Sequence, residues 1–374
     1  GLTQRVCQIQ RLSEQDVLDL CMYGLVHDIG HGPFSHQIEP VVQGSHHDQC
    51  LRVLERMASE MRACGVEPDT IRRMFTGEDT RLNWVSDRNL GTDKLDYLQR
   101  DALHIGFTGV PDIEQLLLYT VMVDGTLAIE EKFMEEIKRL QKFYSYLHQH
   151  GYLNKTALSV QRVFQRAVEE ELGEGRTSPE ALWEMTDAEL MRWLHGGRNR
   201  TAARLIEHVE TRTLYRSTIV IKPTGYAFVE RTACKPVRVA EWSRPKLRAF
   251  SEAVADPEAM RRLEDRVAEQ AGLAPGELLF AAMPYFDKLL PRDVRIYRKD
   301  GQHFQLFERD RYHHNSLLGD YLSTFAIRLI AVPERRNAVI RCAQSILALL
   351  EEAIADSMPK PKQPFRARRG ELFQ

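Results

Sequence analysis

Apolar residues in the first half of the chain recur at the spacing of an α-helix. From Leu12 onward they fall three or four positions apart, and Ser13 with Asp16 forms a plausible capping box at the start of the first helix. Glycines and prolines separate the helices, which we expect over about residues 12–30, 48–64, 92–103, 112–122, 130–149 and 155–172. Two shorter helices should follow before residue 197, so residues 1–210 are predicted to form one helical domain.

Alternation with the period of a β-strand appears only after residue 210. Residues 217–222 and 226–230 are rich in β-branched and aromatic side chains and flank a Pro-Thr-Gly turn. A second pair, 294–299 and 303–309, flanks an Asp-Gly dipeptide at 300–301, which favours a tight hairpin turn because both positions accept positive φ. The sequence therefore predicts two hairpins within one small subdomain.

The expected fold class is mainly α, a helical domain followed by a small α+β subdomain over residues 211–357. Helices at about 317–331 and 334–356 should close that subdomain. Residues 358–374 should form a basic flexible tail, a candidate for contact with polyphosphate or nucleic acid through Lys360, Lys362, Arg366, Arg368 and Arg369.

Composition and charge exclude several classes of protein. The chain has 374 residues and a hydrophobic content of 43%, which is typical of a globular protein. Its 51 Lys and Arg against 53 Asp and Glu leave a net charge of −2, so no general attraction to nucleic acid or membrane is implied. No apolar run is long enough to span a membrane and the first residues lack signal-peptide features, so we expect a cytoplasmic protein. The cysteines form no C-x-x-C pair and are expected to be free thiols.

Metal-ligand residue types are densest around His27-Asp28 and His31. The pair stands at the end of a helix that is otherwise apolar on its core side, where polar side chains are costly unless they are paired or bound to a metal. An imidazole nitrogen and the adjacent carboxylate can bind one divalent cation, and the following turn can aim His31 at the same cavity. The alternative is a helix end capped by a histidine.

A second polar segment follows on the helix predicted over 92–103. Asp93, Tyr97 and Asp101 are four residues apart and therefore share one face. Asp93 offers a further metal ligand, Lys94 and Tyr97 are suited to phosphate, and Asp101 to a sugar hydroxyl. The alternative is a solvated helix face without a site.

These motifs together carry a resemblance to a known family. Residues 24–36, then 47–49, then 93–101 resemble, in that order, the HD-domain phosphohydrolases, and within them the deoxynucleoside triphosphate (dNTP) triphosphohydrolases. The resemblance implies that His27, Asp28 and Asp93 bind the catalytic metal and converge on one point.

Other roles are implied by the same resemblance. His31 and His47 would lie beside the phosphates, one of them as acid or hydrogen-bond donor to the leaving group. Tyr152 would pack on the sugar or base, Lys94 and Tyr97 would contact phosphate, and Asp101 would bind the sugar. The two other histidines of the cluster, His36 and His46, have no implied role and are taken as structural.

Two features depart from the family pattern. The family's first metal ligand is a histidine that precedes the His-Asp pair, and no counterpart precedes His27. We therefore expect an N-terminal segment outside this chain to supply it, facing the open side of the metal site. The family often has a phosphate-binding Arg before Tyr152, whereas residues 143–148 are largely aromatic, which makes a nucleic-acid end a credible substrate.

The function expected from the sequence is metal-dependent hydrolysis of dNTPs to deoxynucleoside and tripolyphosphate. Two alternatives stay open: a nuclease or phosphodiesterase acting on single-stranded nucleic acid or cyclic nucleotides, and a non-catalytic nucleotide-binding scaffold. The ligand set suits Mn, Mg, Fe, Zn or Ni. The resemblance also implies a homo-oligomer.

Overall fold

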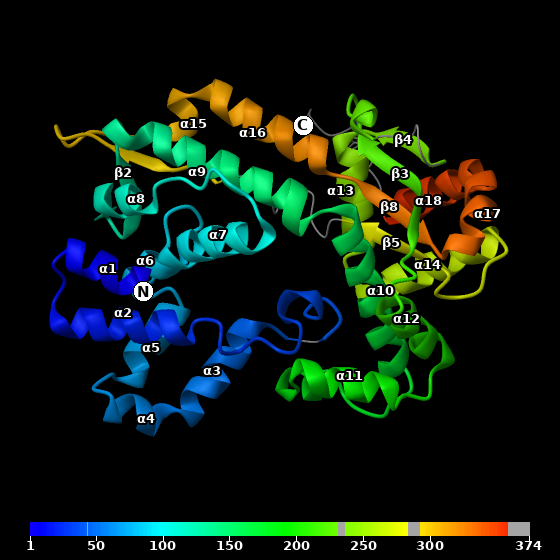
Figure 1. The fold of residues 1–374 in the computed structure, drawn as a ribbon, viewed down its shortest axis with the longest axis horizontal. Helices are drawn as coiled ribbons and strands as arrows, with labels where there is room; N and C mark the ends of the chain where they lie inside the picture. The colour runs from blue at the N-terminus through cyan, green and yellow to red at the C-terminus, as the bar shows by residue number, and fades with distance from the viewer. Residues whose placement is uncertain (43, 231–235, 283–291, 358–374) are drawn as a thin grey trace, which may run out of the picture.

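The structure is a computed structural model that describes residues 1–42, 44–230, 236–282 and 292–357. It confirms a mainly α protein with small sheets (Figure 1). The predicted tail at 358–374 lies outside the described residues. No helix in the described part of the chain is both long and apolar enough to cross a bilayer.

The N-terminal body, blue to cyan in Figure 1, is mostly helical. Its α-helices are α1 (Leu2–Ile9), α2 (Glu14–Val26), α3 (His46–Arg56), α4 (Ala58–Ala63), α5 (Pro68–Phe75), α6 (Asn83–Ser86), α7 (Thr92–Ile105), α8 (Ile113–Tyr119) and α9 (Met134–Leu147). The predicted cap of the first helix is confirmed, because the Ser13 side chain accepts a hydrogen bond from the Asp16 amide. The helix predicted over 48–64 is broken at Met57 into α3 and α4.

The C-terminal body packs helices against a sheet. Its α-helices are α10 (Lys155–Leu172), α11 (Asp187–His195), α12 (Arg200–Glu210), α13 (Arg244–Ala253), α14 (Pro257–Gln270), α17 (Arg336–Arg341) and α18 (Ala343–Ser357). Two further helices, α15 (Leu306–Arg309) and α16 (Arg311–Thr324), lead into this body, and α16 packs along α9 (Figure 1).

The described strands form two sheets of four strands each, with the orders β1-β2-β6-β7 and β4-β3-β8-β5. The first sheet comprises β1 (Thr120–Val123), β2 (Thr126–Glu130), β6 (Arg295–Tyr297) and β7 (His303–Gln305). The second comprises β3 (Arg216–Pro223), β4 (Arg238–Trp242), β5 (Leu278–Ala282) and β8 (Ile327–Ala331). The first sheet therefore joins two hairpins that lie more than 160 residues apart in the sequence.

The second predicted hairpin is confirmed but lies in an unexpected place. Strands β6 and β7 pair antiparallel around the 298–302 turn, and β6 pairs in parallel with β2. Val294, Ile296 and Leu306 are buried in the hydrophobic core of the N-terminal body. The β6–β7 hairpin thus packs with the N-terminal body and not with β3, because its apolar face is buried in the core of that body.

Several secondary-structure predictions are wrong, among them the strand over 303–309, since residues 306–309 form helix α15. Residues 226–230 contain a 3-10 turn instead of a strand, because β4 and β8 already occupy both edges of β3. The helix predicted over 112–122 ends at Tyr119, since the positive φ of Asp124 and Gly125 closes a β1–β2 hairpin. Residues 327–331 form β8 and not the end of a helix, a common ambiguity for a short apolar run.

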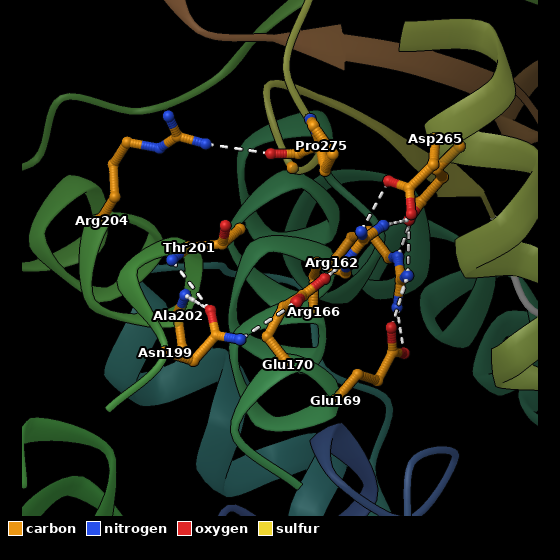
Figure 2. Close-up of polar contacts among 12 residues, drawn as sticks. Arg162, Arg166, Glu169, Glu170, Asn199, Thr201, Ala202, Arg204, Asp265 and Pro275 are labelled. Atoms are coloured by element: carbon orange, nitrogen blue, oxygen red, sulfur yellow. Dashed lines mark hydrogen bonds and ion pairs between the residues drawn. The ribbon is translucent and has the colours of Figure 1, made fainter. Parts of the chain in front are cut away.

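A buried ion network holds α10 against α14 (Figure 2). Arg162 and Arg166 both donate hydrogen bonds to the carboxylate of Glu264, which is fully buried and also accepts one from the Phe280 amide. Glu169 pairs with Arg162 from two turns further along α10. Because each charge has several partners, the network fixes the register of these helices.

Candidate metal and phosphate site

The His-Asp pair stands at the C-terminal end of α2, where the chain leaves the helix. His27 caps the helix and a turn follows through Gly30. A Cβ atom at Gly30 would lie 2.3 Å from the backbone nitrogen of Cys50 and from the backbone oxygen of His46, so only glycine allows α3 to approach this turn. The glycine thus brings the start of α3 beside the His-Asp pair.

Helix α7 brings Asp93 to the same place. It begins at Thr92, whose hydroxyl lies 2.9 Å from that of Thr3 and ties α7 to α1. A Cβ at Gly91 would lie 2.4 Å from the Val85 carbonyl oxygen, so the tight entry to the helix requires glycine. Asp93 is in the first turn of α7, which faces the end of α2.

The structure brings His27, Asp28 and Asp93 together. One ligand atom from each lies within 4.8 Å of the others, and Nε2 of His27 is 3.4 Å from an oxygen of each aspartate. Nδ1 of His27 lies 2.9 Å from the Gly24 carbonyl, which can only accept, so Nδ1 carries the proton. Nε2 is therefore the nitrogen that faces the two carboxylates, and this buried atom has no hydrogen-bond partner. These residues fit a divalent cation.

The charges around His27 also suit a cation. Burial lowers the pKa of His27, but Asp93 and Asp28 outweigh it and hold the pKa above its usual value. The pKa of Asp28 is lowered by its interaction with His31 and by the charge of His27. Both carboxylates thus stabilise positive charge at this point, whether it is a proton or a metal ion.

His31 lies next to this group and faces a second cluster. Its Nε2 is 3.5 Å from Asp28, and its Nδ1 is 3.2 Å from Glu39. Glu39 also accepts from Nδ1 of His46 at 2.6 Å, and the rings of His31 and His46 stack at 4.3 Å. Burial opposes the charge on His31, but Asp28 and Glu39 raise its pKa to about 9. Burial instead lowers the pKa of His46.

The position of His47 differs from that of its neighbour. His47 is exposed, and its ring lies 4.2 Å from the ring of His46. His46, taken from the sequence as structural, contacts both His31 and Glu39. His46, and not His47, is thus the histidine that lies against His31 and Glu39, and the role that the resemblance implies for His47 stays a prediction.

The predicted phosphate and sugar residues lie along α7. Lys94 donates to the Arg88 carbonyl at 2.6 Å and lies over the Tyr144 ring, and burial lowers its pKa to about 8. The Tyr152 hydroxyl donates to Asp101 at 2.6 Å, which joins the two residues assigned to the sugar. Tyr97 is half-buried, and burial raises its pKa.

Aromatic rings accompany these residues. His148 packs against Tyr144 and Tyr152 with centroid distances of 4.0 and 5.0 Å. Burial lowers the pKa of His148 to about 4, so the ring is neutral near pH 7. His104 and His150 are exposed. The expected aromatic character of residues 143–148 is thus present beside Lys94.

The turn between α2 and α3 is held by the C-terminal body. Phe34 and Ser35 adopt positive φ values of 54° and 51°, a strained conformation for residues other than glycine. The Phe34 amide donates to Asp187 at the start of α11, and Ile38 is buried in the C-terminal core. The strained turn that carries His31, His36 and Glu39 therefore spans both bodies.

Glu39 was missed by sequence reasoning. It lies in an irregular turn, where no helical or strand period relates it to His31 or His46. The one signal was composition, since three histidines of the cluster and a carboxylate fall within residues 31–46. In the part of the chain that the structure describes, no fourth side chain joins the His27-Asp28-Asp93 group.

Several known proteins resemble this chain in sequence. Residues 112–256 match a family model described as HD associated region. The chain is 23% identical over 234 residues to a deoxynucleoside triphosphate triphosphohydrolase SAMHD1 homolog of Dictyostelium discoideum, covering 55% of this chain and 45% of that protein. It is 24% identical over 230 residues to the metal-dependent phosphohydrolase cns2 of Cordyceps militaris, covering 56% and 66%. The chain thus spans about half the length of the SAMHD1 homolog.

Solved structures share the fold. A phosphohydrolase of Bacteroides thetaiotaomicron superposes with a TM-score of 0.59 at 19% identity, covering 86% of this chain and 81% of that one. A hypothetical protein of Aquifex aeolicus gives a TM-score of 0.63 at 16% identity, covering 91% and 83%. The fold, the His-Asp site and the sequence relatives make the chain similar to the HD-domain phosphohydrolases. Within that class, it resembles the dNTP triphosphohydrolases.

Proposed function

We propose that the chain is a metal-dependent phosphohydrolase that cleaves dNTPs to deoxynucleoside and tripolyphosphate. The main support is the convergence of His27, Asp28 and Asp93, whose ligand atoms lie within 4.8 Å of one another. Lys94 and Asp101, suited to phosphate and sugar, lie on the helix that carries Asp93. One helix thus connects the metal ligands to the groups expected to hold a nucleotide.

The metal would be held by Nε2 of His27 and by the carboxylates of Asp28 and Asp93. This mixed nitrogen and oxygen set suits Mn²⁺, Mg²⁺, Fe²⁺, Zn²⁺ or Ni²⁺. A divalent cation there would lower the pKa of a bound water and polarise a phosphoryl oxygen. The Gly24 carbonyl fixes the tautomer of His27, so the histidine is prepared for this role before metal binding.

His31 is suited to protonate the leaving group. In the proposed reaction water attacks the α-phosphorus, the bond from phosphorus to the ester oxygen breaks, and the departing deoxynucleoside oxygen takes a proton. His31 has a pKa of about 9 and therefore holds that proton at neutral pH. Glu39 lies beside Nδ1 of His31 and Nδ1 of His46 and so positions both rings. Lys94 stabilises negative charge on the phosphates.

A second candidate function is supported by the aromatic rings. Tyr144 occupies the segment where the related triphosphohydrolases often have a phosphate-binding Arg, and it stacks with His148. Aromatic rings bind the bases of single-stranded nucleic acid without regard to sequence. A phosphodiesterase or nuclease that uses the same metal ligands is therefore the alternative.

One assay distinguishes these functions. The purified protein is incubated with Mn²⁺ and, in separate reactions, with each dNTP, a cyclic nucleotide and single-stranded DNA, and the products are identified by chromatography. The proposal predicts deoxynucleoside and tripolyphosphate from dNTPs. Nucleotides released from DNA or from the cyclic substrate would support the phosphodiesterase instead. Nucleotide binding without any product would indicate a binding protein.

A further inference from the structure

A second group of metal-ligand side chains lies beside the first. His31, His36, Glu39 and His46 each offer one ligand atom, and these atoms all lie within 4.8 Å of one another. The first three come from the strained turn after α2, and His46 is the first residue of α3. The group shares no member with His27, Asp28 and Asp93.

In each of the three histidines of this group, Nδ1 is the nitrogen that faces the carboxylate of Glu39. Nδ1 of His46 and Nδ1 of His36 lie 2.6 and 3.0 Å from the two oxygens of Glu39. Nδ1 of His31 is 3.2 Å from Glu39 but makes no hydrogen bond, and this atom is buried. A buried nitrogen without a partner is costly, and a bound cation is one way to satisfy it.

We propose that His31, His36, Glu39 and His46 form a second metal site, which takes Zn²⁺. Three neutral imidazoles and one carboxylate are a donor set that zinc binds with four ligands. The first site has one imidazole and two carboxylates, which is a harder set and suits Mn²⁺ or Mg²⁺ better. The two sites therefore differ in the metal that each prefers.

Small movements suffice to close the second site. Tetrahedral zinc with ligands at 2.0 to 2.1 Å holds its donor atoms about 3.3 Å apart. The side chain of His36 is 67% exposed, so it can turn toward the other three without disturbing the core. His46 and His31 already stack at 4.3 Å and approach Glu39 from the same side.

The second site lies directly beside the first. His31 joins the two sites, since its Nδ1 faces Glu39 and its Nε2 lies 3.5 Å from Asp28. Zinc bound to Nδ1 would therefore fix the His31 ring next to Asp28.

Zinc binding tests this proposal without substrate. The full chain is saturated with Mn²⁺, dialysed against a series of free Zn²⁺ concentrations, and both metals are measured by mass spectrometry. At low free zinc, wild type should bind one equivalent of zinc and keep its manganese, whereas higher zinc should displace manganese from the first site. His36→Asn should weaken zinc binding by at least about 10-fold, since even residues outside a ligand shell often contribute that much. His47→Asn, which alters the exposed neighbour of His46, should leave zinc affinity unchanged.

A variant of the first site separates the two proposals. Asp93→Asn should lose manganese and still bind one equivalent of zinc. Two results would overturn the second site. One is the loss of zinc together with manganese in Asp93→Asn. The other is an equal zinc affinity in wild type, His36→Asn and a folded His46→Asn. Circular dichroism of each metal-free variant verifies its fold. Because zinc binding is measured without turnover, failure of the dNTP assay leaves this result unaffected.

Discussion

At the scale of single residues, the site depends on which nitrogen of each histidine faces a carboxylate. The resemblance to the HD-domain family placed His27, Asp28 and Asp93 in one site, whereas the residues alone also allowed a capping histidine and a solvated helix face. It did not predict Glu39, which reaches the histidines through an irregular turn. The resemblance assigned a phosphate role to His47, whereas the structure places His46 against His31 and Glu39.

The two adjacent histidines give the first prediction. His46→Ala should slow turnover by roughly 10² or more, the range typical for acid-base groups, because it removes the ring that contacts His31 and Glu39. His47→Ala, a change on the exposed neighbour, should alter turnover by no more than about threefold. Steady-state kinetics of both variants with the same substrate measures this. A larger loss of turnover in His47→Ala than in His46→Ala would instead support the role that the resemblance implies for His47.

Lys94 gives a prediction about pH. Burial lowers the pKa of Lys94 to about 8, so its positive charge is present below pH 8 and is lost above it. The affinity for inorganic tripolyphosphate, measured by calorimetry, should therefore fall between pH 7 and pH 9. Lys94→Arg keeps its charge over this range and should show a smaller fall. Equal pH profiles for the two proteins would exclude Lys94 from phosphate binding.

At the scale of elements, helices were predicted better than strands. The helix predicted over 155–172 has the same bounds as α10, because its start is fixed by the Asn154 cap and its apolar face repeats regularly. Strands β1, β2 and β8 were missed, because their short apolar runs fit either a buried strand or a helix. Their pairing partners lie far away in sequence, so tertiary contacts decide their conformation.

The ion network between α10 and α14 gives a prediction about stability. Glu264→Gln should reduce the free energy of unfolding by about 3 kcal/mol, because Arg162 and Arg166 then keep buried positive charge without a full counter-charge. Glu258→Gln on the same helix alters a pair with both side chains exposed and should change stability by less than about 1 kcal/mol. Urea unfolding of both variants measures the difference. Equal effects would show that the network does not hold α10 against α14.

At the scale of the whole molecule, both bodies contribute contacts to the turn that carries the site. The His-Asp turn belongs to the N-terminal body, yet Ile38 is buried in the other core and Asp187 binds the Phe34 amide. The domain division and the homo-oligomer expected from the sequence stay predictions. The fold class was predictable because helical periodicity covers most of the chain, whereas the sharing of strands between distant segments was not.

The proposed metal centre is tested most directly by two matched variants. For each variant, metal content and turnover are measured on the same sample. Asp93→Asn removes a carboxylate 3.4 Å from His27, whereas Asp96→Asn alters an exposed carboxylate on the same helix that pairs with Arg100. We expect folded Asp93→Asn to lose both manganese and turnover, and Asp96→Asn to keep both. A folded Asp93→Asn protein with full manganese occupancy and wild-type turnover would contradict the assignment of His27, Asp28 and Asp93 as the catalytic metal site.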